Sequence, residues 1–197
     1  MASTGRIYGT SGSNITAGGN AWTNAANVDG AASGDYATTS CEFPADASDY
    51  LATSIAATPI DGAVTSVTLG CRIKTDLVPV PSTCSVTISL FNSAGTQLGH
   101  ATINSGFGTT EADIEARLGL LSGSTFADIK AAVEAGITKA AGPKGLTVAV
   151  SNFDGDAIEF SLASVWLDVS YAKGPIYQDA SPSAILTRTI LVDVINP

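Results

Sequence analysis

Few residues of this chain could take part in catalysis. Nucleophilic catalysis needs a base beside the nucleophile, and His100 is the only histidine. It lies in a predicted strand, and no signature such as G-x-S-x-G surrounds it, so we interpret it as a strand residue that faces solvent or a hydrogen-bond partner. Two carboxylates that converge in space could still cleave a glycosidic bond. Nearly every acidic residue, however, lies at a turn or helix-cap position, and we expect that the protein is not an enzyme.

Metal and phosphate sites have little support in the sequence. Three cysteines and one histidine do not favour a zinc site, and the glycine-rich stretch 9–19 lacks the Lys-Ser/Thr of a phosphate-binding loop. Loop aspartates could hold a structural calcium ion, although no spacing matches an EF-hand and turn formation explains them equally well. We expect no bound cofactor. The aspartates concerned are Asp29, Asp35, Asp46, Asp49, Asp154 and Asp156.

Trp166 is the candidate for a surface on which a sugar ring could stack. It lies on the opposite phase to Val165 and Leu167 in a predicted strand, so its side chain is expected on the other face. The alternative, which we favour, is that Trp166 packs under the predicted helices or against the C-terminal segment.

Composition and charge restrict the classes of partner. Of the 197 residues 45% are apolar and only 14% are charged, as in a packed globular protein. The net charge is −9, and the densest basic pair is Arg72 with Lys74, which argues against nucleic acid as a partner. No stretch is apolar for long enough to span a bilayer, and the N-terminus does not resemble a secretory signal. We expect a protein that is made in a host cytoplasm.

The cysteines are expected to be free thiols. Cys71 and Cys84 lie on the apolar phase of predicted strands, where a small buried hydrophobic residue belongs. A Cys71–Cys84 disulfide remains the alternative.

Strands dominate the predicted structure. Strict alternation of apolar and polar residues, in 65–74 and again in 83–91, predicts that one face of each strand meets a core. Residues 96–104, 146–150 and 157–171 complete the pattern. The alternation in the last of these changes phase at Leu162-Ala163, which predicts a β-bulge.

Two short helices are expected within residues 110–141. Thr110 and Asp113 could cap the first, and Thr125 and Asp128 the second, which would end at Gly142-Pro143. The prediction is therefore a mainly β fold, an antiparallel jelly-roll-like β-sandwich in residues 1–172 with these two helices inserted. Residues 173–197 would form an extended C-terminal arm.

The arm is strongly β-prone and apolar on both faces of a strand. Such a strand is costly to leave in water, so we expect it to add to a sheet edge of a neighbouring copy or of another protein. The alternative is that the arm folds back on its own sandwich. The assembly residues are Ile185, Leu186, Ile190, Leu191, Val192, Val194 and Ile195.

Several short motifs of turns and core positions recur in one known family. Together they resemble jelly-roll sandwich domains common in structural proteins of tailed bacteriophages, especially phages of high-GC Gram-positive hosts, and found in some bacterial surface proteins. The resemblance covers residues 7–171 and carries no catalytic residues. Its landmarks are Trp22, Asn24, Asn27, Asp29-Gly30, Asp35-Tyr36-Ala37, Tyr50-Leu51, Pro59, Asp61-Gly62-Ala63, Val67, Thr125-Phe126-Ala127-Asp128-Ile129 and the closing Ser164-Val165-Trp166-Leu167-Asp168-Val169-Ser170-Tyr171.

The resemblance implies a virion component. It would be a non-enzymatic minor tail or tail-tip subunit, or an accessory (decoration) protein of the capsid. Its partners would be other virion proteins and copies of itself, and the architecture class suggests a trimer. The alternative function is a carbohydrate-binding or adhesin module that contacts a glycan of the host surface.

Overall fold

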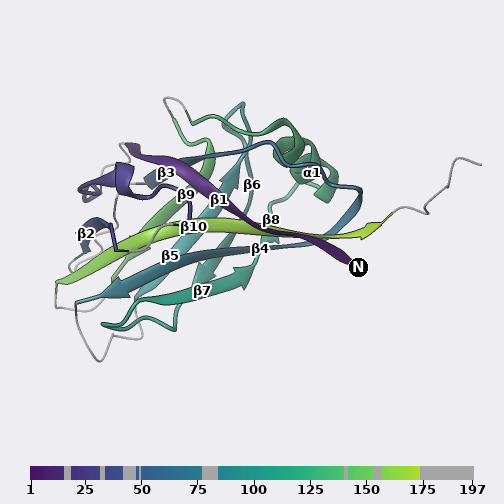
Figure 1. Cartoon of the computed structure of the whole chain (residues 1–197). Helices are drawn as coiled ribbons and strands as arrows, with labels where there is room; N and C mark the ends of the chain where they lie inside the picture. Colours follow the sequence, from purple (N-terminus) through teal and green to yellow (C-terminus); the bar gives the residue numbers. More distant parts are fainter. Residues whose placement is uncertain are drawn as a thin grey trace, which may run out of the picture.

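A computed structural model of the 197-residue chain describes residues 1–15, 19–31, 34–41, 48, 50–76, 84–139, 142–152 and 157–173 (Figure 1). Antiparallel strands make up most of this part. The elements are β1 (Ala2–Ile15), the short 3-10 helix η1 (Ala25–Asn27), β2 (Ala37–Cys41), β3 (Tyr50–Ile55), β4 (Gly62–Thr75), β5 (Ser85–Phe91), β6 (Gln97–Ile103), β7 (Ala112–Arg117), β8 (Gly119–Leu120), α1 (Phe126–Ala135), β9 (Gly145–Ser151) and β10 (Ile158–Lys173).

The strands follow one hydrogen-bonded path, β7-β4-β10-β1-β3-β9-β5-β6-β8, with β2 paired to β10 beside it. We call the layer of β7, β4, β10, β2 and the first half of β1 sheet A, and the layer of the second half of β1, β3, β9, β5, β6 and β8 sheet B. One apolar cluster draws side chains from both layers. The predicted antiparallel β-sandwich is confirmed.

Strand β1 joins the two sheets. Its first half pairs with β10 and its second half with β3, with a register shift between Thr10 and Ser13. Gly9 lies where the strand passes from one sheet to the other. A β-carbon there would come within 2.1 Å of Thr53 Oγ1 and 3.0 Å of Val165, so only glycine fits this close approach.

The alternating segments point into the core as predicted. In β4 the side chains of Val67, Leu69, Cys71 and Ile73 are fully buried, and the apolar residues of β5 lie opposite them in the same cluster. Burying one such aliphatic side chain stabilises the fold by about 1.5–3 kcal/mol. The core between the sheets is therefore the main source of stability.

The predicted bulge in the last long strand is present. The pairing of β10 with β4 shifts register between Leu162 and Ser164, at the residues where the apolar phase changes. Beyond the bulge, Val165 and Leu167 face the core while Ser164 and Trp166 face the other side of sheet A. The bulge thus decides which side chains of β10 reach the outer surface.

The second predicted helix is confirmed, and it is shorter than expected. Helix α1 begins after Thr125, whose side chain accepts a hydrogen bond from the Asp128 amide while the Asp128 carboxylate accepts one from Thr125. It buries Ile129 and Val133 and ends at Gly136, before the expected stop. Figure 1 shows α1 at one end of the sandwich.

The first predicted helix, in residues 110–121, is wrong. These residues form β7 and β8, and β7 pairs with β4 from Thr68↔Arg117 to Ile73↔Ala112. The strand β7 also alternates with a period of two, and Ile114 and Leu118 are the two residues of the segment that are buried in the core cluster. Pairing along the edge of β4 that β10 leaves free satisfies the backbone hydrogen-bonding groups of this segment. The segment therefore forms a strand and not a helix.

The three cysteines are free and buried, so the expected free thiols are present and the Cys71–Cys84 alternative is not. No helix in the described ranges is long and apolar enough to cross a membrane. The described sandwich ends with β10 at Lys173. The assembly residues between Ile185 and Ile195 lie outside the described residues, so the arm stays a prediction.

Candidate functional site

The candidate site is the side of sheet A that faces away from the core. Charged and aromatic side chains from strands far apart in sequence gather on it, because the core-facing residues of each strand alternate with them. We call this set the sheet A outer face. It consists of Arg6, Tyr8, Tyr36, Arg72, Lys74, Glu111, Asp113, Glu115, Ser164 and Trp166.

Trp166 lies flat on the sheet. Its pairing partner in β4 is Gly70, and a β-carbon on Gly70 would come within 2.6 Å of the indole ring. The guanidinium of Arg6 covers the ring at 4.0 Å from the centroid. Tyr8 stands beside it, with ring centroids 5.9 Å apart and the planes tilted by 59°.

Arg6, which covers the Trp166 ring, is held in place by ion pairs to two carboxylates of β7. Arg6 Nη1 donates to Asp113 Oδ2 at 2.6 Å, and Arg6 Nη2 lies 3.9 Å from Glu115 Oε2. On the other side of Asp113, Arg72 Nε donates to Oδ1 at 2.7 Å and Nη2 to Oδ2 at 3.3 Å. Asp113 therefore bridges β1 and β4 through two guanidinium groups.

The network continues past Arg72 toward β2. Arg72 Nε lies 3.4 Å from Glu111 Oε1, and the hydroxyl of Tyr36 donates to Glu111 Oε2 at 2.5 Å. The ammonium of Lys74 stands 4.1 Å from the centre of the Tyr36 ring. The face thus forms one connected row of alternating charges between two aromatic groups.

These contacts shift the pKa values in consistent directions. The hydrogen bond from Arg72 lowers the pKa of Asp113, partial burial opposes this effect, and the hydrogen bond from Arg6 adds to it. The hydrogen bond to Asp113 likewise raises the pKa of both Arg6 and Arg72. The pKa of Tyr36 is raised, first by its hydrogen bond to Glu111 and then by burial. All these groups keep their ordinary charge near neutral pH.

Two buried polar atoms on this face have no hydrogen-bond partner. They are the indole Nε1 of Trp166 and Oγ of Ser164, two residues earlier on the same side of β10, and each residue is 1% exposed. Buried polar groups are nearly always paired, so two unpaired atoms side by side need a physical reason. The only other such side-chain atom among the described residues is Thr147 Oγ1 in sheet B.

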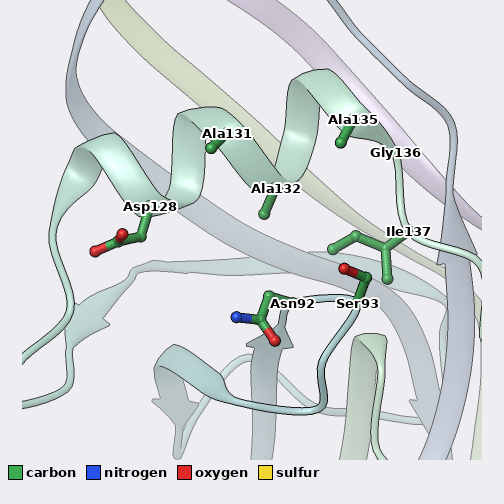
Figure 2. Close-up of a pocket in the computed structure, with 8 residues that line it drawn as sticks. All are labelled: Asn92, Ser93, Asp128, Ala131, Ala132, Ala135, Gly136 and Ile137. Carbon is green, nitrogen blue, oxygen red and sulfur yellow. The ribbon is translucent and has the colours of Figure 1, made fainter.

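A second candidate is the pocket of about 250 Å³ under helix α1 (Figure 2). Ala131, Ala132 and Ala135 of the helix face the turn of Asn92 and Ser93 across it, and Asp128 lies at its rim. Asp128 already serves the helix cap, and the Asn92 side chain accepts hydrogen bonds from its own turn. The pocket offers small apolar walls and no free reactive group.

Two further hollows meet at Glu159, near the end of sheet A where β2 pairs with β10. Their volumes are about 380 and 320 Å³. Threonine and serine line the first, with Asn20, and the second includes Lys74 and Asp76. Glu159 is the one acidic residue that lines both hollows. The second hollow also holds the carboxylate of Asp76, whose Oδ1 accepts a hydrogen bond from the Glu159 backbone amide at 2.9 Å.

The other residues considered from the sequence lie apart. His100 is exposed on β6 opposite Ser89, far along the sheet path from the sheet A outer face. Of the loop aspartates, Asp29 accepts a hydrogen bond from the Ser11 amide at 3.2 Å, Asp35 is exposed, and the remaining four lie outside the described residues. Within the described ranges, no group of three or more His, Cys, Asp or Glu is placed to hold a metal ion.

Trp166 does not lie open to solvent as a sugar platform. It does lie on the side of its strand that the alternation predicts, but Arg6 and its neighbours leave it 1% exposed. The sequence places Arg72 and Lys74 on the polar side of β4, but it does not reveal the ion pairs of Arg72 or the contact of Lys74 with the Tyr36 ring. Asp113 was interpreted as a helix cap, and Arg6 carried no signal, because their contacts depend on which strands become neighbours.

No family model matches the sequence, and no curated protein matches it. Among solved structures, the chain is similar to the ligand-free CBM1 of BiXyn10A, with 10% identity, a TM-score of 0.38, and 86% of this chain and 93% of the other covered. It is also similar to the CBM22-1–GH10 modules of the Clostridium thermocellum endo-1,4-β-D-xylanase 10B, complexed with xylohexaose. That match has 13% identity and a TM-score of 0.37, and spans 87% of this chain but only 29% of the other. Similarity at this level carries no argument about function.

Proposed function

We propose that the chain is a non-enzymatic structural subunit of a tailed-phage virion, either a minor tail or tail-tip subunit or an accessory (decoration) protein of the capsid. One observation carries the proposal. Strand β10 ends at Lys173, which pairs with Gly62, and the described strands already pack the core between the two sheets. The segment 174–197, which the sequence predicts to be an attachment arm, follows this sandwich. An apolar segment after a packed sandwich is suited to attachment.

The two ends of the sandwich chain support an attachment at one pole. Ala2 pairs with Tyr171, so the start of β1 and the end of β10 lie side by side (Figure 1). A subunit held through its C-terminal arm would be fixed at this end, with the sheet A outer face left accessible. Its partners would be other virion proteins and copies of itself, with a trimer as the first assembly to test.

The experiment compares the full chain, a chain that ends at Lys173, and a full-length variant with Ile190→Ser, Val192→Ser and Val194→Ser. A matched control carries Thr187→Ser and Thr189→Ser in the same arm. Sedimentation velocity measures self-assembly, and mass spectrometry of purified phage particles measures incorporation. We expect both arm variants to fold and to be missing from particles, while the control is incorporated. Particles that lack the full chain, or that incorporate the truncated chain equally well, would overturn the proposal.

A second candidate function is a carbohydrate-binding or adhesin module that contacts the host surface. The observation that favours it is the flat indole of Trp166 on the sheet A outer face, beside Tyr8 and a row of charged groups. A tail subunit can combine attachment and glycan binding, so the two candidates are tested separately.

A further inference from the structure

We propose that the sheet A outer face binds a neutral oligosaccharide, with Trp166 as the stacking surface and Arg6 as the side chain that moves aside to admit the sugar. This inference gives the second candidate function a site and a ligand class. It does not depend on whether the chain belongs to a virion.

The position of the ring is the first support. Trp166 rests on Gly70, the only residue type that leaves room for an indole flat on β4. A ring that lies parallel to a sheet presents its whole outer face, which is the geometry that stacking on an aromatic side chain requires. Tyr8, tilted by 59° to the indole, borders this surface from β1.

The unpaired atoms are the second support, and they are independent of the ring geometry. Trp166 Nε1 can only donate, whereas Ser164 Oγ can donate and accept. A sugar carries several hydroxyl groups, each a donor and an acceptor at once. Hydroxyls that reach Ser164 on β10 and the Nε1 edge of the indole over Gly70 of β4 would therefore satisfy both atoms, which the protein itself leaves without partners.

The charges of the face favour a neutral ligand. Three cationic side chains (Arg6, Arg72 and Lys74) stand in one row with three carboxylates (Glu111, Asp113 and Glu115). Asp168 and Arg117, which both pair with Thr68 on the same side of the sheet, add one charge of each sign. A balanced row does not select an ionic ligand, but its planar carboxylates and guanidiniums can bond pairs of neighbouring hydroxyls. Of the exposed large apolar residues in the described chain (Met1, Tyr50 and Leu120), none belongs to this face, so an apolar protein surface fits it poorly.

Arg6 is the side chain best placed to move. Its side chain is 34% exposed, and it is held by one close ion pair to Asp113, a longer one to Glu115, and its contacts with Trp166 and Tyr8. Exposed ion pairs and cation–π contacts of this kind are weak when water reaches them. Asp113 would keep its second partner, Arg72, when Arg6 leaves. Displacing Arg6 therefore uncovers the ring without dismantling the rest of the network.

The test uses the full chain in native affinity gels that contain a soluble neutral polysaccharide (laminarin, mannan, galactomannan or arabinoxylan) or acidic polygalacturonate. The variants are Trp166→Phe, Trp166→Ala and Arg6→Ala. Lys130→Ala is the matched control, because Lys130 is also in an ion pair and is 31% exposed, but lies on α1. Circular dichroism confirms that each variant is folded. A second measurement, acrylamide quenching of tryptophan fluorescence, reports ring exposure without any ligand.

We expect at least one neutral polysaccharide to retard the wild-type chain. Trp166→Ala should weaken the interaction about tenfold, as for the loss of one stacked aromatic contact, and Trp166→Phe should weaken it less. Arg6→Ala should strengthen retardation and raise the quenching, and Lys130→Ala should change neither. Trp22 is 2% exposed in the N-terminal segment, so the change in quenching reports Trp166.

Three results would overturn the inference: no retardation by any neutral polysaccharide in the panel, retardation by polygalacturonate alone, or neutral binding that Trp166→Ala leaves unchanged in a folded protein. Loss of sugar binding would leave incorporation into particles unaffected. A failure here is thus distinguishable from a failure of the virion proposal.

Discussion

Trp166 of β10 pairs with Gly70 of β4, and its indole lies so close to the Gly70 backbone that a β-carbon at residue 70 would be 2.6 Å from the ring. Neither residue contributes to the apolar cluster between the sheets. Their contact therefore shapes the outer surface of the sandwich, and it determines whether a flat aromatic ring is present there at all.

The variant Gly70→Ala should push the Trp166 ring off the sheet. Overpacking of this kind costs about 1–3 kcal/mol in the free energy of unfolding, which urea denaturation measures. The emission of Trp166 should also shift to longer wavelength as the ring becomes hydrated. Gly108→Ala is the control, because nothing lies within 4 Å of a β-carbon there.

A double-mutant cycle separates this steric effect from an intrinsic effect of alanine in the strand. In a Trp166→Ala background, Gly70→Ala should cost clearly less than in the wild-type chain, because the ring is gone. Equal costs in the two backgrounds would show that the contact has no energetic consequence.

The three thiols should not react in the native protein. Cys41, Cys71 and Cys84 are each 0% exposed, and burial raises the pKa of Cys71 far above its ordinary value. A thiol reagent at pH 8 should therefore label none of them until urea unfolds the chain, after which all three should react. Peptide mapping that finds a Cys71–Cys84 disulfide would contradict the structure.

The capping box of α1 gives a prediction for the end of the sandwich where this helix lies. Thr125→Ala removes the side-chain oxygen that accepts from the Asp128 amide, and we expect a loss of about 1 kcal/mol in the free energy of unfolding. Thr125→Ser should retain most of the stability, because the hydroxyl remains. The exposed Thr138, beyond the helix, supplies the control Thr138→Ala. If Thr138→Ala lowered the free energy of unfolding as much as Thr125→Ala, the cap would have no specific contribution to stability.

Local patterns in the sequence predicted the parts of the fold that depend on local rules. The alternation of β4 and β5 follows from burial on one face, the bulge at Leu162 follows from a change of phase, and Thr125 with Asp128 marks the start of α1. Residues 112–117 fit both a helical and a strand period. Only their pairing with β4 decides between the two, and a local pattern does not contain that pairing.

The candidate site is less visible in the sequence, for a related reason. The sequence separates Arg6 from Asp113 by about half of the chain, and the two meet only because β1 and β7 lie on either side of the β10–β4 pair. The alternation of side chains along β10 predicted that Trp166 lies on the side of sheet A that faces away from the core. The residue that covers it depends on strand order and register, which the alternation leaves open.

The ion pairs of Asp113 lead to a prediction for acid stability. Hydrogen bonds from Arg72 and Arg6 lower the pKa of Asp113 below its value in the unfolded chain, about 3.9. A lowered native pKa stabilises the fold above the unfolded value, and this contribution is lost as the pH falls through about 4 toward the native pKa. Asp113→Asn should therefore lower the melting temperature at pH 7 and reduce its fall between about pH 5 and pH 3.

Asp35→Asn, a change at an exposed carboxylate, is the control and should leave the pH profile unchanged. The fall in the Asp113 variant should be reduced and not abolished, because hydrogen bonds also lower the pKa of Asp128 and Glu134. Differential scanning fluorimetry across this pH range measures the effect. Parallel profiles for wild type and Asp113→Asn would mean that the two arginines do not hold this carboxylate in solution. Arg6 would then lack its closest ion pair over Trp166, and quenching by acrylamide should already be high in the wild-type chain.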